Sequence, residues 1–428
     1  MANRRTKKRH IGRKILFGVE ILILIILVGV LFVYAQINKK LDKLDFQETN
    51  EDSQVQVQIN ESVAGSEVLS GYTNIALFGI DKRSEDDGLY GNSDTAIVAS
   101  INNGTKEVRL VSLYRDTYLR VNVDKEADGI YNKCNSAFLQ GGPSQAMTMM
   151  NTNMDLDIED YVAVDFSAMA TVVDCLGGLD VPLSYEEIVH MNNHCVDTSE
   201  QTGLDYTPIE RPDPAPENEA EILGEYHLNG VQVTAYCRIR QTLSGDMGRT
   251  ERQRRVLDLL ADKAKSTSLT KLTSILDQVF PMIQTSFSKS ELMKLGMSIL
   301  SYKMGESTGF PVDYVMGQEL TVPVTGLDCV IPTTLETNVK YLHEFLFGDK
   351  DYQPSEDVMK RSEFVKDRTG FGEKYIAEER KYLISDSQDT SETGSGNEDE
   401  DWNSDDTDSY DGYEDEYDDN GVDVSELE

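Results

Sequence analysis

The chain has 428 residues, with 40 Lys and Arg against 76 Asp and Glu and a formal net charge of −36 at pH 7. This length allows one large domain or two. So acidic a chain repels the phosphate backbone of nucleic acids, which argues against nucleic acid as a partner.

The N-terminus is predicted to be a membrane anchor. Residues 1–14 carry seven positive charges and no acid, and residues 15–35 are apolar apart from Glu20. About 20 apolar residues cross a hydrocarbon core, so we predict one transmembrane helix at 15–35. The positive-inside rule places residues 1–14 in the cytoplasm and the main domain outside the cell. A cleaved signal peptide is the alternative, but the apolar run is long for one.

Residues 36–70 are predicted to be a polar extracellular stalk, and residues 71–350 a folded domain. Apolar or β-branched runs indicate strands at 74–80, 96–101, 108–113 and 161–166, near Val181, and at 314–322 and 329–331. Helical spacing indicates helices at 143–154, 167–176, 230–236, 269–283, 292–300 and 334–347. The polar, proline-bearing residues 191–224 are predicted to be an exposed loop. This alternation predicts an α/β layered fold.

The end of the chain is predicted to form no core. After an extension at 351–385, residues 386–428 contain 19 acids and no Lys or Arg. With so few apolar residues, this acidic tail is predicted to be disordered.

The segment 238–255, RIRQTLSGDMGRTERQRR, contains six arginines and no lysine. Guanidinium groups grip phosphate oxygens in pairs, so this density predicts a polyanionic ligand. Thr250 to Gln253 fits a capping box that opens a helix, which would put Arg249 at a helix N-terminus, a position that favours anions. The alternative is an exposed helix whose arginines pair with surface carboxylates.

Three further segments, 79–81, 92–95 and 114–117, follow or precede predicted strands. Ligands gather at strand ends in α/β sheets, so their charged residues are site candidates. Asp81 and Asp94 could together bind Mg²⁺, which takes one or two carboxylates plus water and substrate phosphates. Alternatively, both stabilise turns, and Arg115 and Asp116 belong to structural ion pairs.

The five cysteines show no C-x-x-C spacing, which argues against a zinc site. An odd number leaves at least one thiol unpaired. Cys195 lies near His190 and His194, a conceivable nucleophile or metal site, although the loop predicted there is polar.

Seven motifs occur in an order and spacing that resemble the LytR-CpsA-Psr family of Gram-positive-type bacteria. They are NIALFGID at 74–81, NSDTAIV at 92–98, VSLYRDT at 111–117, NSAFLQGGP at 135–143, DYVAVDF at 160–166, VVDCLGGLDVPL at 172–183, and RIR with GDMGRTERQRRVL at 238–257. The resemblance implies a three-layer α/β/α fold with a central mixed sheet and an apolar groove. It also implies a membrane phosphotransferase that moves a glycan, such as teichoic acid or capsule, from a polyprenyl pyrophosphate carrier to peptidoglycan.

The resemblance also implies roles for single residues. Asp81 and Asp94 are the expected Mg²⁺ ligands. The expected pyrophosphate-binding residues are Arg115, Arg238, Arg240, Arg249 and Gln253, and the expected catalytic residues are Arg115, Asp116, Arg238 and Arg240. Within this set, Asp116 is expected to orient arginines rather than act as a base.

Two positions depart from the family pattern. Asn92 stands where the family usually has arginine, and Tyr114 where it often has proline. The missing charge at Asn92 keeps open a non-catalytic polyprenyl-phosphate binding protein or cell-wall regulator. A transcription regulator would need a cytoplasmic DNA-facing surface, and only a 14-residue basic tail is predicted there.

Overall fold

The computed structural model describes residues 45–46, 57–81, 92–122, 129–242, 244–279, 282–288, 291 and 301–384. All of them lie in the first of two compact units, Met1–Ile384, the second being Ser385–Glu428. The transmembrane helix predicted at 15–35, the helix at 292–300 and the acidic tail fall outside these ranges. Among the helices that the structure describes, none is long and apolar enough to cross a bilayer.

A seven-stranded mixed sheet forms the centre of this unit, in the order β1-β10-β7-β2-β3-β4-β11. The strands are β1 (Asp45–Phe46), β2 (Tyr72–Asp81), β3 (Asn92–Asn102), β4 (Glu107–Leu113), β7 (Asp160–Asp165), β10 (Ile283–Thr285) and β11 (Lys303–Phe310). β2 and β3 are antiparallel, as are β3 and β4, whereas β7 runs parallel to β2. The predicted strands at 74–80, 96–101, 108–113 and 161–166 are confirmed.

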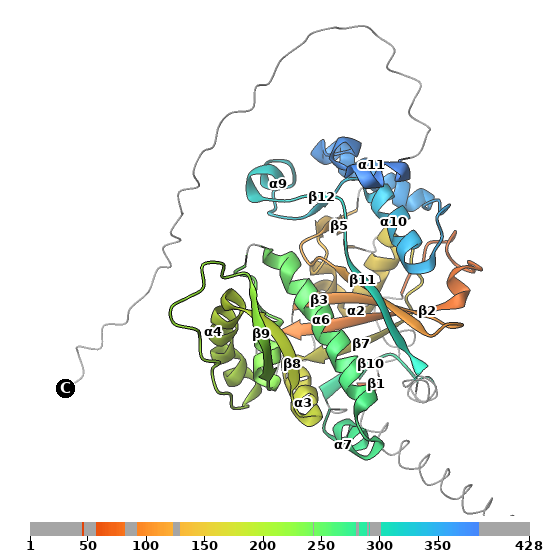
Figure 1. The fold of residues 1–428 in the computed structure, drawn as a ribbon. Coiled ribbons are helices and arrows are strands. Elements are labelled where there is room, and N and C mark those ends of the chain that lie inside the picture. Colours follow the sequence, from red (N-terminus) through yellow and green to blue (C-terminus); the bar gives the residue numbers. More distant parts are fainter. Residues whose placement is uncertain are drawn as a thin grey trace, which may run out of the picture. The chain divides into compact units, whose positions relative to one another are not determined.

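Helices pack on both faces of the sheet. α2 (Ser136–Met154) and α10 (Leu335–Phe347) share one core with Phe78, Val98 and Val111. On the other face, Leu257 of α6 (Gly245–Ser266) packs against a core that includes Ile97, and Figure 1 shows α6 crossing the sheet. The prediction of an α/β fold with a central mixed sheet is confirmed.

A side lobe with its own core lies beside the sheet (Figure 1). It contains α3 (Phe166–Leu176), β8 (Leu179–Ser184), α4 (Tyr185–Thr202), β9 (Ile222–Leu228) and α5 (Gly230–Tyr236). The prediction of a loop over 191–224 is therefore wrong at both ends. α4 buries Ile188, Met191, Cys195 and Thr198 at helical spacing, and its exposed face is polar, which disguised the helix.

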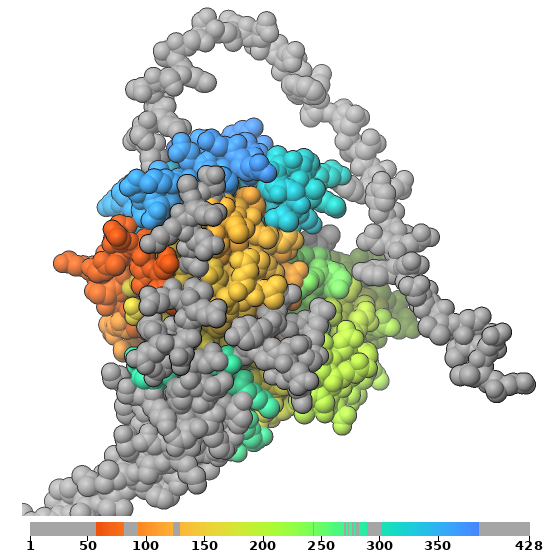
Figure 2. Space-filling view, turned by 180° about the vertical axis from the view of Figure 1, so that it is seen from behind, coloured from red at the N-terminus to blue at the C-terminus, as the bar shows by residue number. Residues whose placement is uncertain are grey.

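α7 (Leu269–Val279) follows α6 in the chain. The C-terminal part, after β11, contains further short elements. They are β12 (Tyr314–Val315), α9 (Gln318–Thr325), β13 (Ile331–Pro332), α11 (Glu356–Thr369) and the 3₁₀ helices η5 (Glu373–Tyr375) and η6 (Glu378–Leu383). The strand predicted at 314–322 is thus wrong beyond Val315. Val63, Leu69 and Val358 join the main core, so packing continues on both sides of 71–350. Figure 2 shows the C-terminal helices, in blue, covering one end of the reverse face.

Candidate functional site

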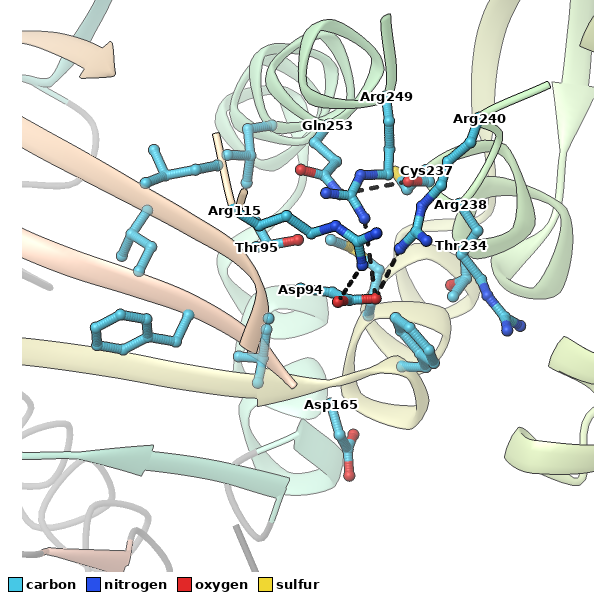
Figure 3. Close-up of a pocket in the computed structure, with 18 of the residues that line it drawn as sticks. Asp94, Thr95, Arg115, Asp165, Thr234, Cys237, Arg238, Arg240, Arg249 and Gln253 are labelled. Atoms are coloured by element: carbon cyan, nitrogen blue, oxygen red, sulfur yellow. Dashed lines mark hydrogen bonds and ion pairs between the residues drawn. The ribbon is translucent and has the colours of Figure 1, made fainter. Parts of the chain in front are cut away.

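One edge of the sheet gathers the charged residues. The parallel strands β2, β4 and β7 end at this edge, and β3 begins there, because it runs antiparallel to β2 and β4. Asp94 stands near the start of β3, and Arg115 follows the end of β4. Arg240 belongs to the segment between α5 and α6. The chain therefore brings Asp94, Arg115, Arg240 and, from α6, Arg249 together from four separate segments (Figure 3).

Asp94 is the centre of an arginine cluster. Its Oδ1 accepts a hydrogen bond from Arg115 Nη1 at 2.8 Å, and its Oδ2 accepts one from Arg240 Nη2 at 2.9 Å. Arg249 Nη1 lies 3.8 Å from the same Oδ2. Burial alone would raise the pKa of the Asp94 carboxyl, but the three arginines hold that pKa below its ordinary value. Asp94 is consequently an ionised counter-charge within the cluster.

Asp246 is a second counter-charge, and the sequence analysis missed it. Its Oδ1 lies 3.1 Å from Arg249 Nη2, 3.6 Å from Arg240 Nε and 3.7 Å from Arg115 Nε. Arg249 is only 2% exposed, and burial lowers the pKa of its guanidinium to about 10. Because Asp246 sits in the first turn of α6, three residues before Arg249, helical spacing could have linked the two residues.

The first turn of α6 also corrects the capping-box prediction. α6 begins at Gly245, so Thr250 lies inside the helix, where its hydroxyl donates to the Met247 carbonyl. Arg249 accordingly stands in the second turn rather than at the helix N-terminus. Gln253 does not close a cap: its Nε2 donates to the Cys237 carbonyl at 3.3 Å, and its buried Oε1 has no hydrogen-bond partner among the described residues.

Arg238 and Asp116 lie apart from the contacts around Asp94. Arg238 Nη1 donates to Thr198 Oγ1 at 2.8 Å, and its guanidinium stacks 5.0 Å from the centre of the Phe166 ring. Figure 3 shows Arg238 directed away from Asp94. The Asp116 carboxylate lies 3.7 Å from Arg115 Nε and 3.4 Å from Lys133 Nζ. These contacts fit an orienting role for Asp116.

A cavity of about 920 Å³ joins these groups to an apolar wall. Its charged and polar lining residues include Asp94, Arg115, Arg238, Arg240, Arg249 and Gln253. The apolar ones include Leu77, Phe78, Ile97, Leu139, Val162, Val164, Phe166, Met169 and Leu257, from β2, β3, β7 and the three helices α2, α3 and α6. A ligand that fits this lining combines an anionic group with a hydrocarbon chain.

The Mg²⁺ prediction is compatible with Asp94. Within the described ranges, no group of three or more His, Cys, Asp or Glu side chains is placed to hold a metal ion. Magnesium needs fewer protein ligands, because it retains water and binds through one or two carboxylates plus substrate phosphates. Asp94 supplies one such carboxylate on the cavity wall. The register pairs Asp81 with Asn92 at the ends of β2 and β3, and the side chains of both lie outside the described atoms.

The Cys/His hypothesis is not supported. Cys195 is fully buried in the core of the side lobe, and burial raises the pKa of its thiol to about 12. A thiol of this kind is a poor nucleophile. His194 does line the cavity, but its Nε2 pairs with Gln241 Oε1 at 3.1 Å. All five cysteines are free.

Comparisons with known proteins agree with the fold. A family model described as the LytR_cpsA_psr family matches residues 30–321. The chain is 29% identical over 321 residues to the "Polyisoprenyl-teichoic acid--peptidoglycan teichoic acid transferase TagU" of Enterococcus faecalis, covering 72% of this chain and 93% of that protein. It is also 29% identical over 231 residues to "Biofilm regulatory protein A" of Streptococcus mutans, covering 52% of each.

Two solved structures share the fold. "TagT bound to LI-WTA" matches with a TM-score of 0.51 and 20% identity, over 72% of this chain and 100% of that one. A Streptococcus agalactiae protein matches with a TM-score of 0.52 and 21% identity, over 71% of this chain and 93% of that one.

Proposed function

Since the chain belongs to the LytR_cpsA_psr family, we propose that it transfers a glycopolymer from a polyprenyl pyrophosphate carrier to peptidoglycan. The observation that carries this proposal is the cavity, where Asp94 and its arginines adjoin a wall of aliphatic and aromatic side chains. A polyprenyl pyrophosphate has both parts, an anionic group and a long hydrocarbon chain. The Enterococcus faecalis relative, named as a teichoic acid transferase, supports the same assignment.

The reaction would be a phosphoryl transfer. A hydroxyl of a peptidoglycan sugar attacks the phosphorus that bears the glycan and gives up its proton to water. The new P–O bond forms as the P–O bond to the leaving polyprenyl phosphate breaks. Negative charge on the phosphoryl oxygens and on the leaving group is neutralised by Arg115, Arg240 and Arg249, which are already oriented by two carboxylates.

Arg238 would bind the carrier from the α4 side of the same cavity, and Gln253 from the α6 side. Asp94 and Asp81 would hold Mg²⁺, which supplies further charge neutralisation to the phosphates when it is bound. Asp116 keeps its role of orienting Arg115. As a ligand approaches, Arg115, Arg240 and Arg249 exchange part of their contact with Asp94 for contact with phosphate oxygens.

The membrane arrangement is part of the proposal. Residues 15–35 cross the membrane once, residues 1–14 stay in the cytoplasm, and the residues between 35 and β1 (Asp45–Phe46) join the span to the domain outside the cell. A carrier embedded in the same membrane would then reach the cavity directly. Protease treatment of intact cells should degrade the domain, whereas protection of the domain would rule out this orientation.

The test of the activity uses full-length protein in detergent, a polyprenyl-pyrophosphoryl oligosaccharide and peptidoglycan, with and without Mg²⁺. We expect oligosaccharide–peptidoglycan product and released polyprenyl phosphate, and a loss of roughly 10²- to 10³-fold in rate for Arg238→Ala and Arg240→Ala. Arg211→Ala, in an exposed loop, is the control that keeps the wild-type rate. Wild-type rates in both site variants would refute the assignment of the arginines.

The chain has Asn92 where the family usually has arginine, and so has one positive charge fewer at this position. This difference favours a second candidate, a binding protein without turnover. The "Biofilm regulatory protein A" relative carries a name of that regulatory kind. Carrier binding without release of polyprenyl phosphate in the same assay would select this candidate. Asn92→Arg would then be expected to confer transfer.

A further inference from the structure

The segment 237–242, called the arginine segment below, carries Arg238 and Arg240 and contains neither helix nor strand. Its middle is weakly held by its own backbone donors: Ile239 N lies 3.4 Å from the Tyr236 carbonyl, and in the described contacts Arg240 N bonds only the neighbouring Gln241 side chain. A binding site for a polyanion nevertheless requires guanidinium groups at fixed positions. Something outside the segment must therefore hold it.

Arg252 of α6 makes two of the contacts that do so, on either side of Arg240. Its Nη1 donates to the Ile239 carbonyl at 3.2 Å, which lies between Arg238 and Arg240 in sequence. Its Nη2 donates to Thr242 Oγ1 at 2.9 Å, on the other side of Arg240. Two donors of one rigid guanidinium thus flank Arg240.

Glu187 of α4 anchors this guanidinium from the side lobe. Arg252 Nε donates to Glu187 Oε1 at 2.9 Å, while Glu187 Oε2 accepts from the backbone of Ser184 in the capping box of α4. The two residues are 5% and 7% exposed. Because the Glu187 carboxylate is buried and bonded to the cap of α4, it holds the Arg252 guanidinium in one orientation. The other hydrogen bonds of that guanidinium then fix the position of the arginine segment.

Arg252 does not line the cavity, in contrast to Arg238, Arg240 and Arg249. The three donors just described bond to protein oxygens, so they are not available to a ligand. Among the arginines of 238–255, Arg252 therefore has a role separate from ligand contact.

We propose that Arg252, anchored by Glu187, is a positioning residue that sets the location of Arg238 and Arg240 for the pyrophosphate group of the carrier. The ligand class rests on the proposed function. The positioning role rests on the contacts of Arg252 alone.

The test is binding of inorganic pyrophosphate to the full-length protein in detergent, by calorimetry. We expect Arg252→Gln to weaken binding about tenfold, the effect of losing one charge-assisted contact. The control is Arg254→Gln. Arg254 is equally buried on α6, but its Nη1 bonds Thr250 of its own helix, so this variant should bind as the wild type does.

A double-mutant cycle separates positioning from a general loss of structure. In an Arg238→Ala, Arg240→Ala background, Arg252→Gln should cause no further loss, since it acts through those two residues. Additive losses would overturn the proposal. Glu187→Gln provides a second route if Arg252→Gln fails to fold, and it should weaken binding less, with wild-type affinity again counting against the proposal.

The design also distinguishes the two levels of inference. If Arg238→Ala, Arg240→Ala protein binds pyrophosphate as tightly as the wild type, the proposed function of the site fails. If that variant loses binding while Arg252→Gln retains it, only the positioning role fails.

Discussion

Asp246→Asn is expected to weaken the fold while making it more responsive to an anionic ligand. Asparagine keeps the shape of the side chain but removes the charge that lies 3.1 Å from buried Arg249 and within 4 Å of Arg115 and Arg240. Breaking a buried ion pair costs about 3–5 kcal/mol. A single hydrogen bond to a charged group contributes about 1.5–3 kcal/mol. Because Asp246 is 25% exposed, we expect a loss of about 2–3 kcal/mol.

The assay is thermal unfolding with increasing inorganic pyrophosphate. For a large domain, the loss corresponds to a fall in Tm of roughly 4–6 °C. A ligand at 100 times its Kd returns about 2.7 kcal/mol. The variant lacks one negative charge beside the arginines and should bind pyrophosphate more tightly, so the same pyrophosphate concentration should raise its Tm more than that of the wild type. Asp262→Asn is the control, since Asp262 is an exposed residue of the same helix that pairs only with Lys265 in the described contacts. An unchanged Tm, or an equal response to pyrophosphate in both proteins, would refute the role of Asp246 as a counter-charge.

Three further outcomes are expected from unfolding measurements. Thr234→Val should leave the Tm unchanged or raise it, because the buried Thr234 hydroxyl has no hydrogen-bond partner in the part of the chain that the structure describes, whereas Thr369→Val should lower the Tm by losing a bond inside α11. Burial lowers the pKa of His343 from 6.5 to about 4. Between pH 6.5 and pH 4 the unfolded chain binds a proton at this residue and the folded protein does not, so the free energy of unfolding decreases as the pH falls through this range. His343→Gln should remove that slope of up to about 1.4 kcal/mol per pH unit. Gly230→Ala would put a Cβ 2.1 Å from a backbone oxygen of α3, so a large loss of Tm and separation of α5 from α3 are expected.

The elements that were predicted correctly have strong local patterns. The runs at 74–80 and 96–101 are nearly continuous apolar stretches, which is typical of a strand buried on both faces. α4 was not predicted because only one in three or four of its residues is buried, and the prolines that follow it suggested a loop. α9 was not predicted because Pro323 lies inside this short helix. The low helix propensity of proline opposes the helix that packing imposes there.

The site could be predicted only as a set of residue types. The arginine density of 238–255 indicated an anionic ligand, and the strand-end rule brought Asp94 and Arg115 to one edge of the sheet. Pairing is a tertiary property, so the sequence did not reveal that Asp94 accepts from Arg115 and Arg240 while Arg252 bonds Glu187. The capping-box pattern even pointed to the wrong helix start, because it cannot be told apart from the same letters inside a helix.

The two carboxylates among the arginines also bear on ionic strength. Three guanidinium groups, of Arg115, Arg240 and Arg249, face the two carboxylates of Asp94 and Asp246, while Asp116 beside Arg115 is balanced by Lys133, so the cluster carries a net charge of +1. Long-range attraction of an anion depends on this net charge, whereas short-range contact depends on each guanidinium separately. Association with a charged carrier is consequently slowed little by salt, and a site of this kind selects its anion by close-range contact with each guanidinium.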